Sequence, residues 1–279
     1  MGIVHSPMHM KQTSPPWSNR HACPAAASRT QCALAGFTLV ELLVVITIIL
    51  TLAALTFGVV VKTRQRADNV LAISNMRQIG AAIASYMTEN DHLPTFRDVG
   101  VSPAYSTNDP YTQASVLQPY LGIPELTSKT QYALIFRPPG LKPDNMSGQK
   151  NWHEVTSYAM YNNEYITPSK AYLPKGVVTD SEGQDVGPFG RYTGGGTPVD
   201  GWRSAQLDAA LTRFTAENGG KIATLSKAPA MFEINAEYPS AKGSWPWPVP
   251  EKTLRQDHVN VLYFDWRVES VTPKFFFTP

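Results

Sequence analysis

The chain of 279 residues has few cysteines, few charges and few long apolar runs. Its two cysteines, Cys23 and Cys32, both lie within the first 36 residues. Residues 37–279 therefore cannot form a disulfide or a cysteine-based metal site. Charged residues make up only 16% of the chain and the formal net charge is +2, so composition gives no indication of a nucleic-acid-binding surface. A membrane-length apolar run occurs once, at residues 37–61.

This apolar run contains 25 residues and one formal charge, Glu41. As a helix it would extend roughly 37 Å, which exceeds the hydrocarbon core of a bilayer at about 30 Å. A charged side chain at the bilayer centre costs about 2.5 to 3.5 kcal/mol on insertion scales, so we expect Glu41 to need a cationic partner. A free α-amine, created by cleavage after Gly36, would be such a partner.

The start of the run, Gly36-Phe37-Thr38-Leu39-Val40-Glu41-Leu42-Leu43, resembles the leader motif of type IV pilins and type II secretion pseudopilins. The resemblance implies that a prepilin peptidase cuts between Gly36 and Phe37 and N-methylates the new amine. It also implies that Glu41 is the carboxylate used in filament assembly. The alternative is a plain signal anchor with one glutamate near the membrane interface.

Residues 1–36 show no amphipathic period and no apolar stretch of their own, and we expect them not to fold. The resemblance implies that they are a cleaved leader. This leader holds three of the 24 basic residues and none of the 22 acidic ones, which leaves 21 against 22 in the mature chain. Near the apolar run, two arginines precede it and three basic residues, Lys62, Arg64 and Arg66, follow it. The distribution of basic residues therefore slightly favours an N-terminal end outside the cytoplasm. The family resemblance implies instead that the N-terminal end lies inside.

The helix is expected to continue beyond the membrane, because residues 62–92 contain no proline and carry an apolar stripe. The stripe comprises Val70, Ile73, Met76, Ile79, Ile83 and Tyr86. Asn90, Asp91 and Pro94 supply a stop signal. Gly58 and Gly80 are interpreted as positions of close packing or slight bending. This segment also resembles the corresponding part of large bacterial pseudopilin-like families.

The remainder reads as a loop-rich globular part with short elements. Strands are predicted at 131–136, 154–161 and 230–234, and short helices at 114–120 and 202–216. Residues 176–201 hold eight glycines without a phosphate-loop lysine, and a long surface loop is predicted there. The Trp- and Pro-rich stretch 244–250 is interpreted as a cap on the core or a recognition surface.

The end of the chain, residues 257–270, predicts a hairpin that turns near Asp265. It resembles the C-terminal signature of the same pseudopilin-like families, in which a histidine precedes an Asn-Val-Leu-x-x-Asp-Gly-x-Val string. Asn260, Asp265 and Val268 match that string, whereas Trp266 stands where the signature has glycine. Because an Asp-Gly turn relies on glycine for positive φ, Trp266 predicts a different turn.

Few residues indicate catalysis or metal binding. Asp257 and His258 are read as a polar pair at a strand entry rather than as an acid–base pair, and no His-Glu-x-x-His motif occurs. Asp180, Glu182 and Asp185 offer oxygen ligands in a glycine-rich loop, which leaves calcium as a minor hypothesis. We expect no cofactor, no metal and no enzymatic activity.

Taken together, the sequence predicts an α+β protein of pilin-like type. Its parts are a cleaved leader (1–36), a transmembrane helix half (37–61), an amphipathic helix half (62–92), and a globular domain on a small antiparallel sheet (93–279). The resemblance implies a filament subunit of the bacterial inner membrane, crossing it once, with the globular domain in the periplasm or on a surface filament. Its partners would be the prepilin peptidase, other pilin-like subunits and an inner-membrane assembly platform, and no nucleic acid is expected.

Two other functions stay open on the sequence. One is a membrane-anchored binding module or enzyme that uses the helix only as a tether, which a clustered catalytic set would favour. The other is a minor pilin that binds DNA, which would need a basic exposed patch.

Overall fold

The computed structural model describes residues 37–97, 101–141, 158–160, 179, 183, 186–190, 198–217, 224–234 and 258–272. Its helices are α1 (Leu39–Asn90), α2 (Gln113–Leu121), α3 (Ser204–Glu217) and the 3₁₀ helix η1 (Leu134–Phe136). Its strands are β1 (Ala104–Tyr105), β2 (Gln131–Tyr132), β3 (Tyr158–Met160), β4 (Pro229–Glu233), β5 (Val259–Tyr263) and β6 (Val268–Val271). The chain divides into two compact units, Met1–Ala53 and Ala54–Pro279. These elements confirm the α+β class.

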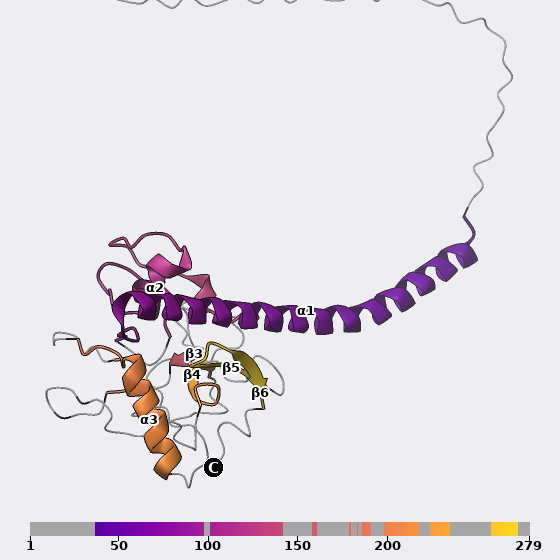
Figure 1. Ribbon diagram of the computed structural model, residues 1–279. Coiled ribbons are helices and arrows are strands. Elements are labelled where there is room, and N and C mark those ends of the chain that lie inside the picture. The colour runs from indigo at the N-terminus through magenta and orange to yellow at the C-terminus, as the bar shows by residue number, and fades with distance from the viewer. Residues whose placement is uncertain are drawn as a thin grey trace, which may run out of the picture. The chain divides into compact units, whose positions relative to one another are not determined.

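Helix α1 is the longest element, with 52 residues (Figure 1). The predicted continuity past Val61 and the predicted stop are both confirmed, since the helix ends at Asn90. Asp91 then adopts φ 60°, and its N–H donates to the carbonyl of Met87 at 2.9 Å. A residue in the left-handed conformation directly after a helix is a common way to end it.

The buried stripe of α1 begins later than predicted. Met76, Ile79 and Ile83 are fully buried, whereas Val70 is 67% exposed. Each three-residue step falls about 60° short of a full helical turn. Three such steps separate Val70 from Ile79, so Val70 lies on the opposite side of the helix. Ala72 takes its place on the buried face.

The second half of α1 packs on a four-stranded antiparallel sheet of order β3-β4-β5-β6. In Figure 1 these strands lie beside that half of the helix. A methyl group added at Gly80 would lie 3.0 Å from Leu262 Cδ1 and 3.5 Å from Trp266 Cβ. The prediction that Gly80 marks close packing is therefore confirmed. On strand β5, Leu262 joins the α1 core, while Val259, Val261 and Tyr263 form a second buried cluster with Ala159, Phe232 and Ile234.

The predicted strand at 131–136 is wrong beyond Tyr132. Only Gln131 and Tyr132 pair with β1, and Leu134–Phe136 form the 3₁₀ helix η1. A short apolar run bounded by prolines does not distinguish a strand from a buried helical turn by periodicity alone. The helix predicted at 114–120 is confirmed as α2, which Thr112 caps by accepting from the Ser115 N–H at 3.1 Å.

Part of the predicted surface loop is buried. Residues 186–190 are all buried, and Phe189 stacks between Phe96 and Phe264, with ring centroids 5.6 and 5.7 Å away. A Cβ at Gly190 would lie 2.4 Å from the Val199 carbonyl oxygen, and Gly190 has φ 61°. The glycine content here therefore reflects, at least at Gly190, close backbone packing.

The C-terminal hairpin and its turn near Asp265 are confirmed, but the prediction that Trp266 gives a different type of turn is wrong. Strands β5 and β6 pair from Val259↔Val271 to Leu262↔Val268. The Trp266 N–H donates to the Tyr263 carbonyl, and Trp266 itself adopts φ 64°. The turn thus keeps the conformation that normally favours glycine. Packing of Trp266 on the core and edge-on to Phe264 offsets the strain of that conformation.

Arg267 reinforces the same turn. Its guanidinium donates to the Ser226 carbonyl at 2.6 Å, pairs with Glu269, and lies 4.7 Å from the centroid of the Tyr263 ring. Of the remaining predictions, the helix at 202–216 and the strand at 230–234 are confirmed as α3 and β4. The strand predicted at 154–161 is described only at Tyr158–Met160, where it forms β3.

Candidate assembly segment

The first turn of α1 contains the predicted assembly carboxylate. Glu41 accepts two hydrogen bonds from Thr38 at its Oε2 atom, from the backbone N–H at 2.9 Å and from the hydroxyl at 2.8 Å. In return, the Glu41 N–H donates to Thr38 Oγ1 at 3.2 Å. The Thr38 carbonyl accepts from the Leu42 N–H, which places Thr38 at the N-cap of the helix. This reciprocal arrangement is a capping box.

Thr38 is a capping residue that the sequence reasoning passed over. The spacing Thr-x-x-Glu immediately before an apolar run is a recognised signature of a helix start and would have found it. Because both bonds go to Oε2, Thr38 fixes the direction of the Glu41 side chain. Within the described residues Oε1 has no hydrogen-bond partner, so one oxygen is left to receive a cationic donor.

The predicted cleavage point is described on one side only. Phe37 is 73% exposed, directly before Thr38. Gly36, together with the rest of the predicted leader, lies outside the described residues. The arrangement thus brings Phe37 and Glu41 into the same exposed first turn, four residues apart.

The apolar half of α1 exposes side chains around its whole circumference. Its large apolar side chains that the structure describes, among them Leu39, Ile49 and Phe57, have exposed fractions between 44% and 79%. The Thr47 and Thr51 hydroxyls donate to carbonyls one turn earlier, Val44 and Ile48, each at 2.8 Å. Both polar groups are therefore satisfied inside the helix, as an apolar surrounding requires.

By length and composition, α1 is suited to crossing a membrane once, and no part of its most apolar stretch is buried within the protein. A core helix of a soluble protein also has this length and composition, but its apolar face would be covered. The described part of the chain contains no other helix of this kind.

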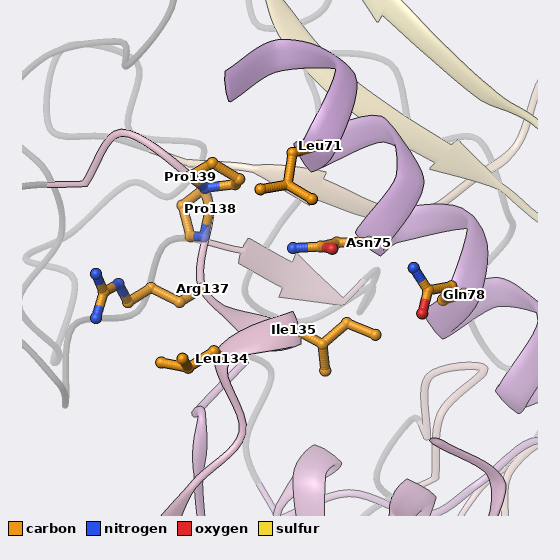
Figure 2. Close-up of a pocket in the computed structure, with 8 residues that line it drawn as sticks. All are labelled: Leu71, Asn75, Gln78, Leu134, Ile135, Arg137, Pro138 and Pro139. Carbon is orange, nitrogen blue, oxygen red and sulfur yellow. The ribbon is translucent and has the colours of Figure 1, made fainter. Parts of the chain in front are cut away.

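A shallow groove of about 370 Å³ lies beside the second half of α1 (Figure 2). One wall is formed by Leu71, Asn75 and Gln78 from α1, and the other by Leu134, Ile135, Arg137, Pro138 and Pro139. Leu134 is 65% exposed and Leu71 is 52% exposed. Partial burial lowers the pKa of Arg137 from its ordinary value. An open apolar groove edged by amides and one cation can accept a ligand but holds no catalytic set.

The described residues give little support to the other hypotheses that the sequence suggested. His258 precedes β5 and its Nε2 atom is buried without a hydrogen-bond partner among them. Asp257, the candidate calcium ligands Asp180, Glu182 and Asp185, and the stretch 244–250 lie outside the described residues. Within the part that is described, no three histidine, cysteine or acidic side chains gather as metal ligands would.

In comparisons with known proteins, no family model, no curated protein and no solved structure matches the chain.

Proposed function

We propose that this protein is a pilin-like or pseudopilin subunit that assembles through α1 into a filament. One observation supports the proposal above the others. A capped first turn presents a single carboxylate at the start of an apolar, uncovered helix half, and that helix runs without a break into the core of a folded unit. A plain tether would gain the same helix start from this capping box, so the processing of Phe37 distinguishes the two functions.

Cleavage before Phe37 would generate an α-amine beside this carboxylate. Within one chain, Glu41 Oε2 already accepts from Thr38, so the amine of another copy is the natural partner for Oε1. A charge-assisted hydrogen bond between the two neutralises both ions away from water. Pairing of this kind draws each stored subunit toward its neighbours and directs a head-to-tail, open assembly.

The continuity of α1 distinguishes this proposal from a removable signal sequence. Secretory signals have an apolar region of about 7–15 residues followed by a cleavage site. Here the apolar run has 25 residues, and the same helix continues through Ile79 and Ile83 in the core. Removing the run would cut through a single helix, whereas removing the residues before Phe37 would leave it whole.

The proposed location is the bacterial inner membrane, with the unit after residue 61 on the extracytoplasmic side. The partners are the prepilin peptidase, other pilin-like subunits and an assembly platform. The deciding experiment is the intact mass and N-terminal sequence of membrane-extracted protein from a host with a prepilin peptidase, compared with the Gly36→Ala variant. We expect an N-methylated Phe37 terminus that is lost in the variant. An uncut chain, or a cut elsewhere, would overturn the proposal.

The groove between α1 and η1 favours a second candidate function, a membrane-anchored binding module. Its apolar walls, Asn75 and Arg137 are suited to a small amphipathic ligand. The same mass measurement separates the candidates, because a binding module has no need of a processed Phe37.

A further inference from the structure

Three cationic side chains lie immediately after the apolar half of α1. They are Lys62, Arg64 and Arg66, and we call them the basic collar. All three are exposed and lie within the helix. They begin directly after Val61, the last residue of the apolar run. A charged group at this position on a membrane-crossing helix lies at the level of the lipid headgroups rather than among the acyl chains.

Within the described residues the basic collar has no anionic partner. The sequence contains no acidic residue between Glu41 and Asp68. Asp68, the first acid after the collar, is half-buried, and its Oδ2 atom lies 3.1 Å from the position that a Cβ on Gly140 would occupy. The collar thus presents three positive charges that its own described chain does not neutralise.

The collar surrounds the helix instead of marking one side of it. At about 100° per residue, Lys62 and Arg66 lie some 40° apart, and Arg64 lies roughly opposite them. A protein partner would contact one side of α1, whereas a lipid leaflet surrounds it. Along the axis the collar occupies about 6 Å, which matches the thickness of one headgroup layer, roughly 5 to 8 Å.

We propose that the basic collar binds the headgroups of anionic phospholipids and thereby fixes the depth of α1 in the membrane. This inference rests on the proposed function, which places the apolar run in a bilayer.

The test is the lipid selectivity of the full chain in vesicles of phosphatidylcholine with one-tenth phosphatidylglycerol. Spin-labelled phosphatidylglycerol and phosphatidylcholine report how strongly each lipid is held against the protein. The test variant is Lys62→Gln/Arg64→Gln/Arg66→Gln. The control, Arg77→Gln/Arg203→Gln/Lys227→Gln, removes the same charge from exposed positions outside the collar.

We expect the wild type to prefer phosphatidylglycerol by fivefold or more at low salt, since each cation near an anionic surface contributes roughly a factor of five. The collar variant should show almost no preference, the control should retain it, and about 1 M salt should weaken it in both. Equal preference in wild type and collar variant, or equal loss in the control, would overturn the inference. Protein that alkaline carbonate strips from the vesicles would instead overturn the membrane placement on which the proposed function depends.

Discussion

The two halves of α1 belong to one helix, yet they meet different surroundings. In the first half Ile49 is 58% exposed, and in the second half Ile79 is fully buried. The apolar side chains of the first half point in every direction, whereas those of the second half gather on one face against the sheet and α2. The comparison teaches that hydrophobicity alone does not assign a partner. The distribution of the apolar side chains around the helix assigns the partner.

The largest expected effect comes from matched truncations in the two halves. Ile79→Ala leaves a cavity in the core, and we expect it to lower the free energy of unfolding by about 2–5 kcal/mol. Ile49→Ala removes the same atoms from an uncovered surface and should change it by no more than about 0.5 kcal/mol. Urea unfolding of the full chain in micelles, followed by tryptophan fluorescence, measures both. Equal effects would mean that the first half also packs on the folded unit.

A smaller effect is expected at the N-cap. Thr38→Val removes the hydroxyl that bonds with both the Glu41 carboxylate and the Glu41 N–H, and a lost cap typically costs about 1 kcal/mol. The Glu41 amide should therefore exchange with solvent about fivefold faster in NMR measurements on micelles.

Two variants make this measurement specific. Thr38→Ser retains the capping hydroxyl and should retain the slow exchange. Thr51→Val removes a mid-helix hydroxyl that donates to the Ile48 carbonyl, and it should leave the first turn unchanged. If Thr38→Val exchanged at the wild-type rate, the capping box would not hold the start of α1.

The smallest expected effect is a change in stability at alkaline pH. It concerns only the second half of α1. The hydrogen bond that the Tyr120 hydroxyl donates to Glu89, 2.6 Å long, raises the pKa of that phenol above its ordinary value. A raised folded-state pKa of an acid means that the neutral form is favoured on folding. The resulting stability is therefore present below the ordinary tyrosine pKa of about 10 and is lost as the pH rises above it.

Tyr120→Phe and Glu89→Gln should each flatten this alkaline loss, by no more than about 0.5 kcal/mol because the site is largely exposed. Thermal unfolding between about pH 8 and pH 11 measures it. Variants with the wild-type pH profile would show that another group titrates.

Periodicity was enough to predict the helices and the C-terminal hairpin from sequence, because long apolar patterns and turn residues act locally. The onset of burial at Ala72 instead of Val70 was also present in the sequence, in the drift of three-residue steps. Burial of residues 186–190 was not, because it depends on Phe96 and Phe264, which lie far away along the chain. Trp266 at positive φ was equally inaccessible, since contacts from α1 and Phe264 offset a local cost.

The candidate site also has a part that could be predicted from the sequence and a part that could not. Gly36, Phe37 and Glu41 stay predictions that rest on the resemblance to a leader motif, whereas Thr38 was available from the Thr-x-x-Glu signature. The groove beside α1 was not predictable, because it requires η1 to form where the pattern indicates a strand. No local signal reports which segment packs next to Leu71.

The central claim is that the first half of α1 serves contacts between copies and the second half serves the fold. Its most direct test is the amount of filament, scored by electron microscopy, in a host with prepilin peptidase and assembly platform. The variants are Glu41→Gln and the control Glu125→Gln, an exposed acid beyond the helix. We predict that Glu41→Gln is processed, stays in the membrane, unfolds like the wild type and forms at least tenfold less filament, while the control assembles normally. Filaments of Glu41→Gln at the wild-type level would contradict the account.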